Sequence, residues 1–347
     1  MGHAAIDNKT AFAVEHMFLS DEEGRPVLVV LIQASFNILA GSDLALSEEQ
    51  PPPSLEGELW GKDANVSSYK IEPAFAFIKP ATDVILIGHA QERGHRVAET
   101  QVLFRVGPVS KVARVIGDRV WVRSAGAIAA TKPLPFDRMP LTYENAFGGW
   151  DRSHADPARH TFEPRNPVGT GFRAPGGAFE EGIRLPNIED PAHPIERYGQ
   201  VVSPTGFGFT SPNWQPRAAL AGTYNEAWSK ERMPFLPKDF DRRFFNAASQ
   251  GLITQGYLAG NEPVLVENVS PMGRISLRLP GLLPPACRVE LARRDDAQLE
   301  MRFDTVIIDT DENRIVMLYR GHVPLHDGPH DVQTISVEEA RPGRRIP

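Results

Sequence analysis

The chain has 347 residues, about twice the length of a typical single domain. Its 29 glycines and 31 prolines disfavour an all-helical protein, because proline removes a helix hydrogen bond and glycine costs backbone entropy. With 37 basic and 44 acidic residues the formal net charge is −7. An acidic chain without a basic block is a poor binder of nucleic acids and of anionic membrane surfaces, so we expect neither as a partner.

Two further features limit the class of protein. The single cysteine, Cys287, excludes an internal disulfide framework, and its place at a strand start predicts a small packing residue. The first residues, MGHAAIDNKT, contain no apolar stretch of the secretory type. The longest aliphatic run, residues 27–32, is far shorter than the ~20 residues that a membrane helix needs, so we expect no membrane insertion.

The first strands are predicted by alternating or continuous apolar residues. Residues 12–18 alternate, residues 20–26 (SDEEGRP) form a turn, and residues 27–38 are too apolar for an edge strand. Together they predict a hairpin with one strand buried on both faces. Residues 44–46 continue this meander, and the three prolines within residues 48–54 predict an extended connection.

Four more strands are predicted before residue 130, at residues 84–89, 100–106, 110–116 and 119–122. Only Gly107-Pro108 and Gly117-Asp118 separate the last three. Such short breaks predict antiparallel pairing, because parallel strands need crossovers of a dozen residues or more. The absence of long helical patterns disfavours a doubly wound nucleotide-binding fold.

The middle of the chain has a different composition. Residues 131–240 hold 15 of the 31 prolines together with many aromatic residues, which flexible linkers lack. We therefore predict ordered irregular structure with two short helices. One spans residues 225–232 with Asn225 as its N-cap. The other spans residues 239–248, with Asp239 as its cap, Phe240 and Phe244 on one face, and Asp241 facing Arg242, Arg243 or a neighbouring loop.

The last third returns to strands. They are predicted at residues 264–268, 274–279, 288–292, 299–308 and 314–320, and the tail from 341 to 347 is expected to be frayed. The fold class is thus mainly β: an antiparallel, sandwich-like β body with a large irregular middle layer rich in proline, glycine and aromatic residues, and a few short helices. We divide the chain into residues 1–130, 131–260 and 261–340, with the first and last segments packed together in one compact unit.

Long strings of residues occur in a specific order along the chain. They are KPATDVILIGHA (79–90), GDRVW (117–121), PLTYENAFGGWD (140–151), NPVGTGF (166–172), LPNIEDP (185–191), GFGF (206–209), AGTYNEAW (221–228), RMPFLPKDFDRRFFNAAS (232–249), LAGNEPV (258–264) and DTVIID (304–309). In these strings the chain resembles the domain-of-unknown-function family 2169 (DUF2169), whose members are accessory proteins of bacterial type VI secretion.

The resemblance implies a non-enzymatic adaptor or chaperone of the bacterial cytoplasm. Such a protein would bind and stabilise a toxic effector, often one with a PAAR-like domain, and help to load it onto the VgrG spike. The family implies no cofactor and offers no established catalytic residues to carry over.

Several clusters have metal-binding residue types without metal-binding spacing. They are His89, Glu92 and His95; His322, His326 and His330; Asp151, His154, Asp156 and His160; and Asp309, Asp311 and Asn313. Glycine and proline interrupt the first two, and the EF-hand-like opening of the last lacks the required Gly and Glu further on. A hairpin turn explains residues 309–313 better, and we predict no metal site.

Glycines in two strings have a structural use. Gly148 and Gly149 permit positive φ, so the chain can reverse sharply before Trp150, and Gly169 and Gly171 allow Phe172 to turn inward. These strings specify either an irregular fold alone or a docking groove for a client segment. For a groove, aromatic and arginine side chains are good anchors because they bury a large area and keep a polar group.

The candidate partner-binding residues all lie in the middle region. They are Tyr143, Glu144, Phe147, Trp150, Asn166, Phe172, Trp214, Arg217, Tyr224 and Trp228, with Arg242 as a further charged neighbour. Gly148, Gly149, Gly169, Gly171, Asp239 and Asp241 are assigned structural roles. One alternative is a hydrolase or lyase acting on carbohydrate or peptidoglycan through carboxylates and histidines of this region; another is a structural component of the spike assembly.

Overall fold

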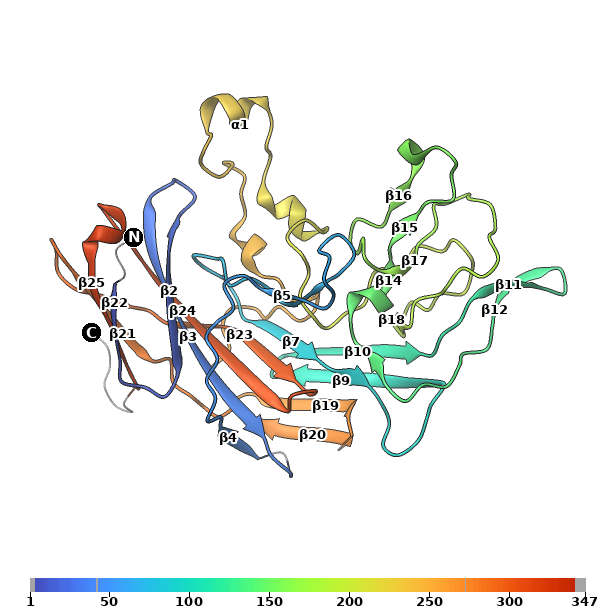
Figure 1. Ribbon diagram of the computed structural model, residues 1–347, viewed down its shortest axis with the longest axis horizontal. Coiled ribbons are helices and arrows are strands. Elements are labelled where there is room, and N and C mark those ends of the chain that lie inside the picture. Colours follow the sequence, from blue (N-terminus) through green and yellow to red (C-terminus); the bar gives the residue numbers. More distant parts are fainter. Residues whose placement is uncertain (1–3, 42, 272, 341–347) are drawn as a thin grey trace.

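The computed structural model describes residues 4–41, 43–271 and 273–340, and the predicted frayed tail lies outside these residues. The protein is mainly β, as predicted, with three larger sheets, several two-stranded ladders and one short α-helix in the described part (Figure 1). Most strand pairs are antiparallel; β1–β25 and β7–β23 are parallel, and so is the short β14–β17 ladder. No helix among the described residues has the length and apolarity that crossing a bilayer requires.

The first sheet joins the two ends of the chain. Its order is β2 (Ala13–Ser20), β3 (Pro26–Ile38), β24 (Arg314–Pro324), β23 (Arg302–Asp309) and β7 (Asp83–Ile87), with β4 (Leu44–Leu46) on β3. The predicted hairpin at residues 12–38 and the turn at residues 309–313 are both confirmed. Strand β3 is central because its side chains are apolar on both faces, and Leu28 to Ile32 are all fully buried.

The second sheet has the order β18 (Ile188–Glu189), β10 (Val109–Ile116), β9 (Glu99–Val106), β19 (Pro263–Ser270) and β20 (Gly273–Arg278). The β9–β10 hairpin is confirmed. The predicted pairing of residues 119–122 with it is wrong. Strand β18 from the middle region pairs with β10 instead, and β11 (Trp121–Ser124) pairs with β12 (Ala127–Ala130).

The third sheet has the order β1 (Ala5–Asn8), β25 (Val332–Glu338), β21 (Ala286–Leu291) and β22 (Ala297–Leu299). The predicted strand at residues 299–308 is therefore split between this sheet and the first. Two-stranded ladders are formed by β5 (Glu58–Leu59) and β6 (Tyr69–Ile71), β8 (His89–Ala90) and β13 (Met139–Pro140), β14 (Phe147–Gly148) and β17 (Thr170–Gly171), and β15 (Trp150–Asp151) and β16 (Thr161–Phe162). One cluster of buried side chains takes members from all three larger sheets.

Helical structure is short. Helix α1 (Glu226–Glu231) is confirmed with Asn225 as its N-cap, whose side chain accepts from Trp228 N. The 3₁₀ turns are η1 (Tyr143–Asn145), η2 (Pro157–Arg159), η3 (Arg217–Ala221), η4 (Arg242–Phe245) and η5 (Gly328–Asp331).

The second predicted helix, residues 239–248, is wrong in length and in its cap. Only the 3₁₀ turn η4 forms, and it is capped by Asp241, which accepts from Arg243 N. Asp239 instead accepts from the backbone N and the hydroxyl of Thr223, so its side chain holds a neighbouring loop. Beyond η4 the backbone amides of Ala247 and Ala248 bond to a carboxylate, which ends the turn.

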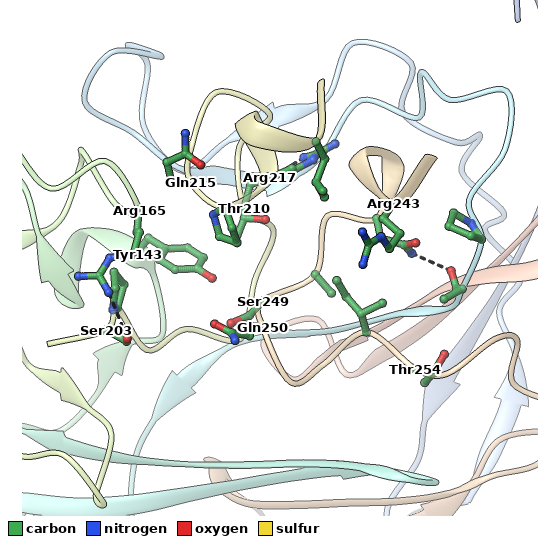
Figure 2. Close-up of a pocket in the computed structure, with 18 residues that line it drawn as sticks. Tyr143, Arg165, Ser203, Thr210, Gln215, Arg217, Arg243, Ser249, Gln250 and Thr254 are labelled. Carbon is green, nitrogen blue, oxygen red and sulfur yellow. Dashed lines mark hydrogen bonds between the residues drawn. The ribbon is translucent and has the colours of Figure 1, made fainter. Parts of the chain in front are cut away.

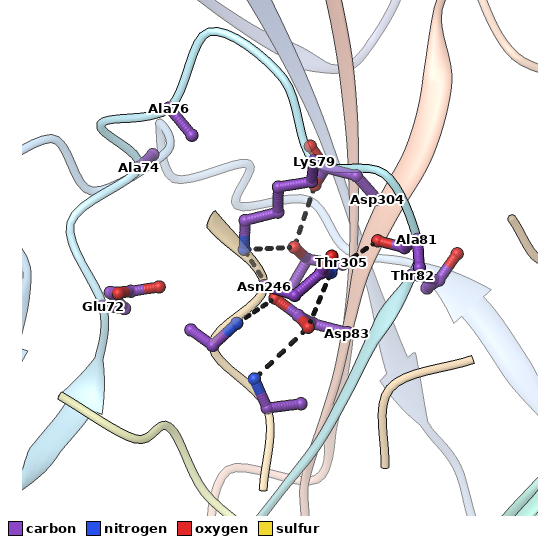
Figure 3. Close-up of polar contacts among 12 residues, drawn as sticks. Glu72, Ala74, Ala76, Lys79, Ala81, Thr82, Asp83, Asn246, Asp304 and Thr305 are labelled. Atoms are coloured by element: carbon purple, nitrogen blue, oxygen red, sulfur yellow. Dashed lines mark hydrogen bonds and ion pairs between the residues drawn. The ribbon is translucent and has the colours of Figure 1, made fainter. Parts of the chain in front are cut away.

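That carboxylate belongs to Asp83 at the start of β7, and it is fully buried. It accepts from Asn246 Nδ2 (3.0 Å), Ala247 N (2.9 Å) and Ala248 N (3.2 Å), and it pairs with Lys79 Nζ at 2.8 Å (Figure 3). These contacts tie the middle region (residues 131–260) to the edge of the first sheet.

The backbone of β7 adds to this attachment. Val84 N donates to Leu252 O and Leu86 N donates to Phe207 O, so irregular segments pair with the outer edge of β7. In Figure 1 the middle region, green to yellow, accordingly stands beside β7, β9 and β10.

Replacing Asp83 tests the attachment. Asp83→Asn should lower the free energy of unfolding by about 3–5 kcal/mol, because it leaves the Lys79 ammonium buried without its counter-charge. Asp296→Asn is the control: it breaks the exposed pair with Arg288 and should cost less than about 1 kcal/mol. Denaturant unfolding measures both, and equal losses would contradict the assignment.

Candidate functional site

A cleft of about 740 Å³ lies in the middle region (Figure 2). Tyr143, Arg165 and Ser203 lie on one side of the cleft, Arg243 lies on the opposite side, and Arg217 lies between them beside Thr210. The segment from residue 246 to 254 contributes to the floor, next to β7. All but two of the residues that line the cleft come from the middle region, the exceptions being Pro80 and Ala81. A cavity of this volume is typical of sites that enclose a ligand of a few hundred daltons or a short peptide segment.

Tyr143 and Trp214 form a buried aromatic pair behind the cleft. Their rings meet edge to face at 5.2 Å between centroids, and Trp214 is 3% exposed. Gly206 lies so close to the Tyr143 ring that any side chain there would overlap it. Burial raises the pKa of Tyr143 to about 12, so its hydroxyl stays protonated, and the facing Ser249 hydroxyl only partly opposes this shift.

Three arginines line the cleft, and each is held by a carboxylate outside the lining. Arg217 is buried, pairs with Glu72, and donates to Thr210 O and Phe244 O. Burial raises the pKa of Glu72 above its usual range, and Arg217 opposes this effect. The cleft therefore has one buried arginine that several contacts hold in place.

The other two arginines are more accessible. Arg165 donates to both carboxylate oxygens of Glu163 through Nε and Nη2, at 2.6 and 2.7 Å. Arg243 pairs with Asp241 at 2.5 Å and has a side chain 72% exposed. The described residues that line the cleft include no Asp, Glu or His.

At the floor a lysine from the second sheet meets a serine of the cleft. Lys111 Nζ on β10 donates to Ser249 Oγ at 2.6 Å and to Gln250 O at 3.0 Å. Burial lowers the pKa of Lys111 to about 8, and the charge of Asp190 only partly opposes this. The contacts of Lys111 with Ser249 and Gln250 support the loop at the floor and place a further basic group under the cleft.

The glycine strings form an interlocked loop. Asn166 is fully buried and its Nδ2 donates to Tyr143 O and Phe147 O. Gly149 has φ +90° and packs so tightly that a Cβ would lie 2.3 Å from Gly169 O. Strand β14, with Phe147 and Gly148, pairs with β17, with Thr170 and Gly171. As predicted, Gly149 has positive φ and Phe172 points inward.

The candidate residues from the sequence divide into two groups. Tyr143, Phe147, Asn166, Phe172, Trp214 and Arg217 are buried. Of these only Tyr143 and Arg217 line the cleft; the others pack beneath or beside it. Glu144 accepts from the backbone N and hydroxyl of Ser68 and so holds the loop before β6.

The remaining candidates are accessible but lie outside the cleft lining. Trp150 is 41% exposed and stacks on Phe162 at 4.5 Å. Tyr224 is 53% exposed and contacts Trp228, whose Nε1 donates to Phe235 O. Their role as partner anchors stays a prediction.

Arg242 is not on the cleft either. It pairs with Glu22 in the turn between β2 and β3 and lies over the Phe77 ring.

The histidine and acidic clusters have structural partners. His89 Nδ1 contacts the Asp311 carboxylate at 2.9 Å, and Asp151 accepts from the backbone N of Ser153 and Ala174. Over residues 4–41, 43–271 and 273–340, no three His, Cys, Asp or Glu side chains gather closely enough to hold a metal ion. Burial raises the pKa of Cys287 to about 12, which keeps this thiol protonated and unreactive.

Sequence reasoning missed Lys111, Ser249, Glu72 and Glu163, whereas the predicted placement of Asp241 beside Arg243 is confirmed. Lys111 falls in the predicted strand at residues 110–116, where one lysine gives no sign of a partner 138 positions away. Two features of the sequence could have indicated the residues of the cleft floor. Lys79 and Asp83 are four residues apart just before an apolar strand, and Ser249 is the last residue of the long string at residues 232–249.

The interlocked glycines can be tested with a matched control. Gly176 also has positive φ (+78°) but nothing lies within 4 Å of a Cβ there. Gly176→Ala should cost about 1–2 kcal/mol from backbone strain alone, whereas Gly149→Ala should cost a further ~1–3 kcal/mol because of overlap with Gly169 O. Thermal unfolding compares the two variants; equal destabilisation would exclude the close packing.

The floor lysine should be unusually reactive. Because the folded protein favours the neutral amine, Lys111 should reach half-maximal acylation near pH 8, whereas an unperturbed lysine does so near ~10.4. The unfolded chain binds more protons between these values, so Lys111 should also make the protein more stable as the pH rises from 8 towards 10. Mass spectrometry after brief acetic anhydride treatment measures the titration, and reactivity still rising above pH 10 would contradict the burial.

The comparisons with known proteins give one family. A family model described as "Uncharacterized protein conserved in bacteria (DUF2169)" matches residues 23–320. No curated protein and no solved structure matches the chain. The match runs from the turn before β3 to residue 320 in β24 and includes the whole middle region with its cleft, so the chain belongs to the DUF2169 family of bacterial proteins.

Proposed function

We propose that the protein is a non-enzymatic adaptor of bacterial type VI secretion, acting in the cytoplasm. It binds and stabilises an effector, in particular one with a PAAR-like domain, and aids its loading onto the VgrG spike. The observation that carries the proposal is the cleft, which has rigid walls, internally paired arginines and an accessible apolar component. The kind of partner is inferred from the resemblance of the motif strings to accessory proteins of this secretion system.

The internal contacts of the cleft support a binding role. Its walls are fixed by buried contacts, such as the Arg217–Glu72 pair and the Tyr143–Trp214 contact, and its floor by Asp83. A preformed surface loses little conformational entropy on binding, which favours a stable complex. A stable complex also buries about 1,600 Å² in total, so the effector must contact surface well beyond the cleft.

A hydrolase is the second candidate. The carbohydrate- or peptidoglycan-acting form considered from the sequence would use carboxylates and histidines, and the described cleft lining has neither. One observation favours a different hydrolase: the 2.6 Å contact between Lys111 Nζ and the Ser249 hydroxyl, a nucleophile beside a basic amine.

Co-purification separates these functions. The full chain, co-expressed with the effectors and VgrG of its source bacterium, should retain an effector through size-exclusion chromatography. Ile253→Trp places a larger, uncharged side chain at the floor of the cleft, where Ile253 is 37% exposed, and should weaken retention at least ~10-fold by filling part of the cleft. Leu134→Trp is the control, because Leu134 is 63% exposed and lies outside the cleft.

Ser249→Ala completes the test. An adaptor should keep its effector complex and the effector's cellular half-life when this hydroxyl is removed. A wild-type chain that never retains effector or spike protein at low salt would overturn the adaptor. Hydrolysis that Ser249→Ala abolishes in a folded protein would establish the enzyme instead.

A further inference from the structure

The cleft differs in charge from the chain as a whole. The protein has a net charge of −7, yet the described residues of the cleft lining include three arginines and no acidic side chain. Two of the carboxylates that hold these arginines are buried, because the side chains of Glu72 and Glu163 are only 8% and 3% exposed. The third, Asp241, is 33% exposed beside Arg243 but does not line the cleft. A ligand that enters the cleft therefore contacts guanidinium groups on the described lining and no lining carboxylate.

The arginines keep hydrogen-bond donors for a ligand. Arg217 is the exception, because it is buried and its guanidinium is bonded to Glu72, Thr210 O and Phe244 O within the protein. Arg243 donates only to Asp241, through Nε and Nη2, so three of its five N–H groups have no acceptor among the described residues. Arg165 donates to Glu163, Ser203 and Val202 O and keeps one N–H.

The floor adds a basic group and neutral polar groups. The Lys111 ammonium contacts Ser249 Oγ and Gln250 O, and no carboxylate of the described residues forms an ion pair with it. Thr210, Gln215 and Gln250 line the cleft with hydroxyl and amide groups, which can pair with the backbone of an extended peptide.

We propose that the cleft binds an extended acidic segment of the client protein, whose carboxylates meet Arg165 on one wall and Arg243 on the other. This inference rests on the adaptor function proposed above and names the part of the client that enters the cleft. Guanidinium groups bind carboxylates with directional, charge-assisted hydrogen bonds, which explains why arginines line both walls. The volume of about 740 Å³ fits a segment of a few residues, with the rest of the client on the surrounding surface.

Fluorescence anisotropy tests the charge of the segment. The probe is a fluorescein-labelled peptide in which Asp alternates with Ala, and its control has Asn at every Asp. The full chain should bind the Asp peptide at least ~10-fold more tightly than the Asn peptide at about 50 mM salt. The difference should shrink at about 500 mM salt, where exposed charges are screened. Equal affinities for the two peptides would overturn the proposal.

Reversing the charge of one cleft arginine tests whether the Asp peptide binds in the cleft. Arg243→Glu should weaken binding of the Asp peptide at least ~10-fold and leave the Asn peptide unchanged. Arg288→Glu is the matched control, because Arg288 also pairs with an aspartate on the surface but lies on β21 of the third sheet. An equal loss in both variants would show general attraction to the surface and contradict the proposal. Arg243 is exposed, so its variant should fold even if Arg165→Glu does not.

The same variants distinguish this inference from the adaptor function. If the effector complex survives Arg243→Glu but not Ile253→Trp, the adaptor stands and the acidic segment is wrong. If both variants release the effector and Leu134→Trp and Arg288→Glu do not, both proposals are supported. If the wild-type chain never retains an effector, the adaptor function itself fails, whatever the peptides show.

Discussion

The arrangement of the middle region depends on one buried carboxylate. Asp83 begins the edge strand of the first sheet and accepts hydrogen bonds from three consecutive residues, 246 to 248, while Lys79 balances its charge. A segment without regular secondary structure must satisfy its backbone amides elsewhere, and here an aspartate supplies the acceptors that a strand or helix would otherwise provide. Because Asn246 and Ala248 also line the cleft, the contact that holds the segment in place sets the position of the floor.

Carboxylates also hold side chains in place in the walls of the cleft. Glu72 and Glu163 are buried and each orients one arginine before any ligand arrives, while Asp241 pairs with the exposed Arg243. Buried ion pairs contribute little to stability compared with apolar packing, but they define a geometry well. Order in this region therefore comes from paired charges and close glycine contacts, with only short helical turns to support it.

The sequence predicted the strands far better than the irregular region. Continuous apolar residues placed β3, and tight turns placed the β2–β3, β9–β10 and β23–β24 hairpins, because these signals are local. The assignment of Asp239 as a cap failed because two aspartates stand two positions apart, and only the chain path decides which one faces the turn. Lys111 and Ser249 could not be paired for a similar reason: their contact joins segments that are distant in sequence. The motif strings nevertheless marked both sides of the Asp83 contact, at residues 79–90 and 232–249.

The outer edge of strand β7 is covered, and this cover opposes self-association of the chain through its strands. Its outer edge would present free amides and carbonyls, the template on which strands of other molecules add. Leu252 and Phe207 occupy that edge through their backbone carbonyls, and they do so without forming a strand that itself has a long open edge. The irregular region thus covers the edge at which the first sheet ends. The proline and glycine residues that make this region irregular also prevent it from pairing as a strand with a neighbouring molecule.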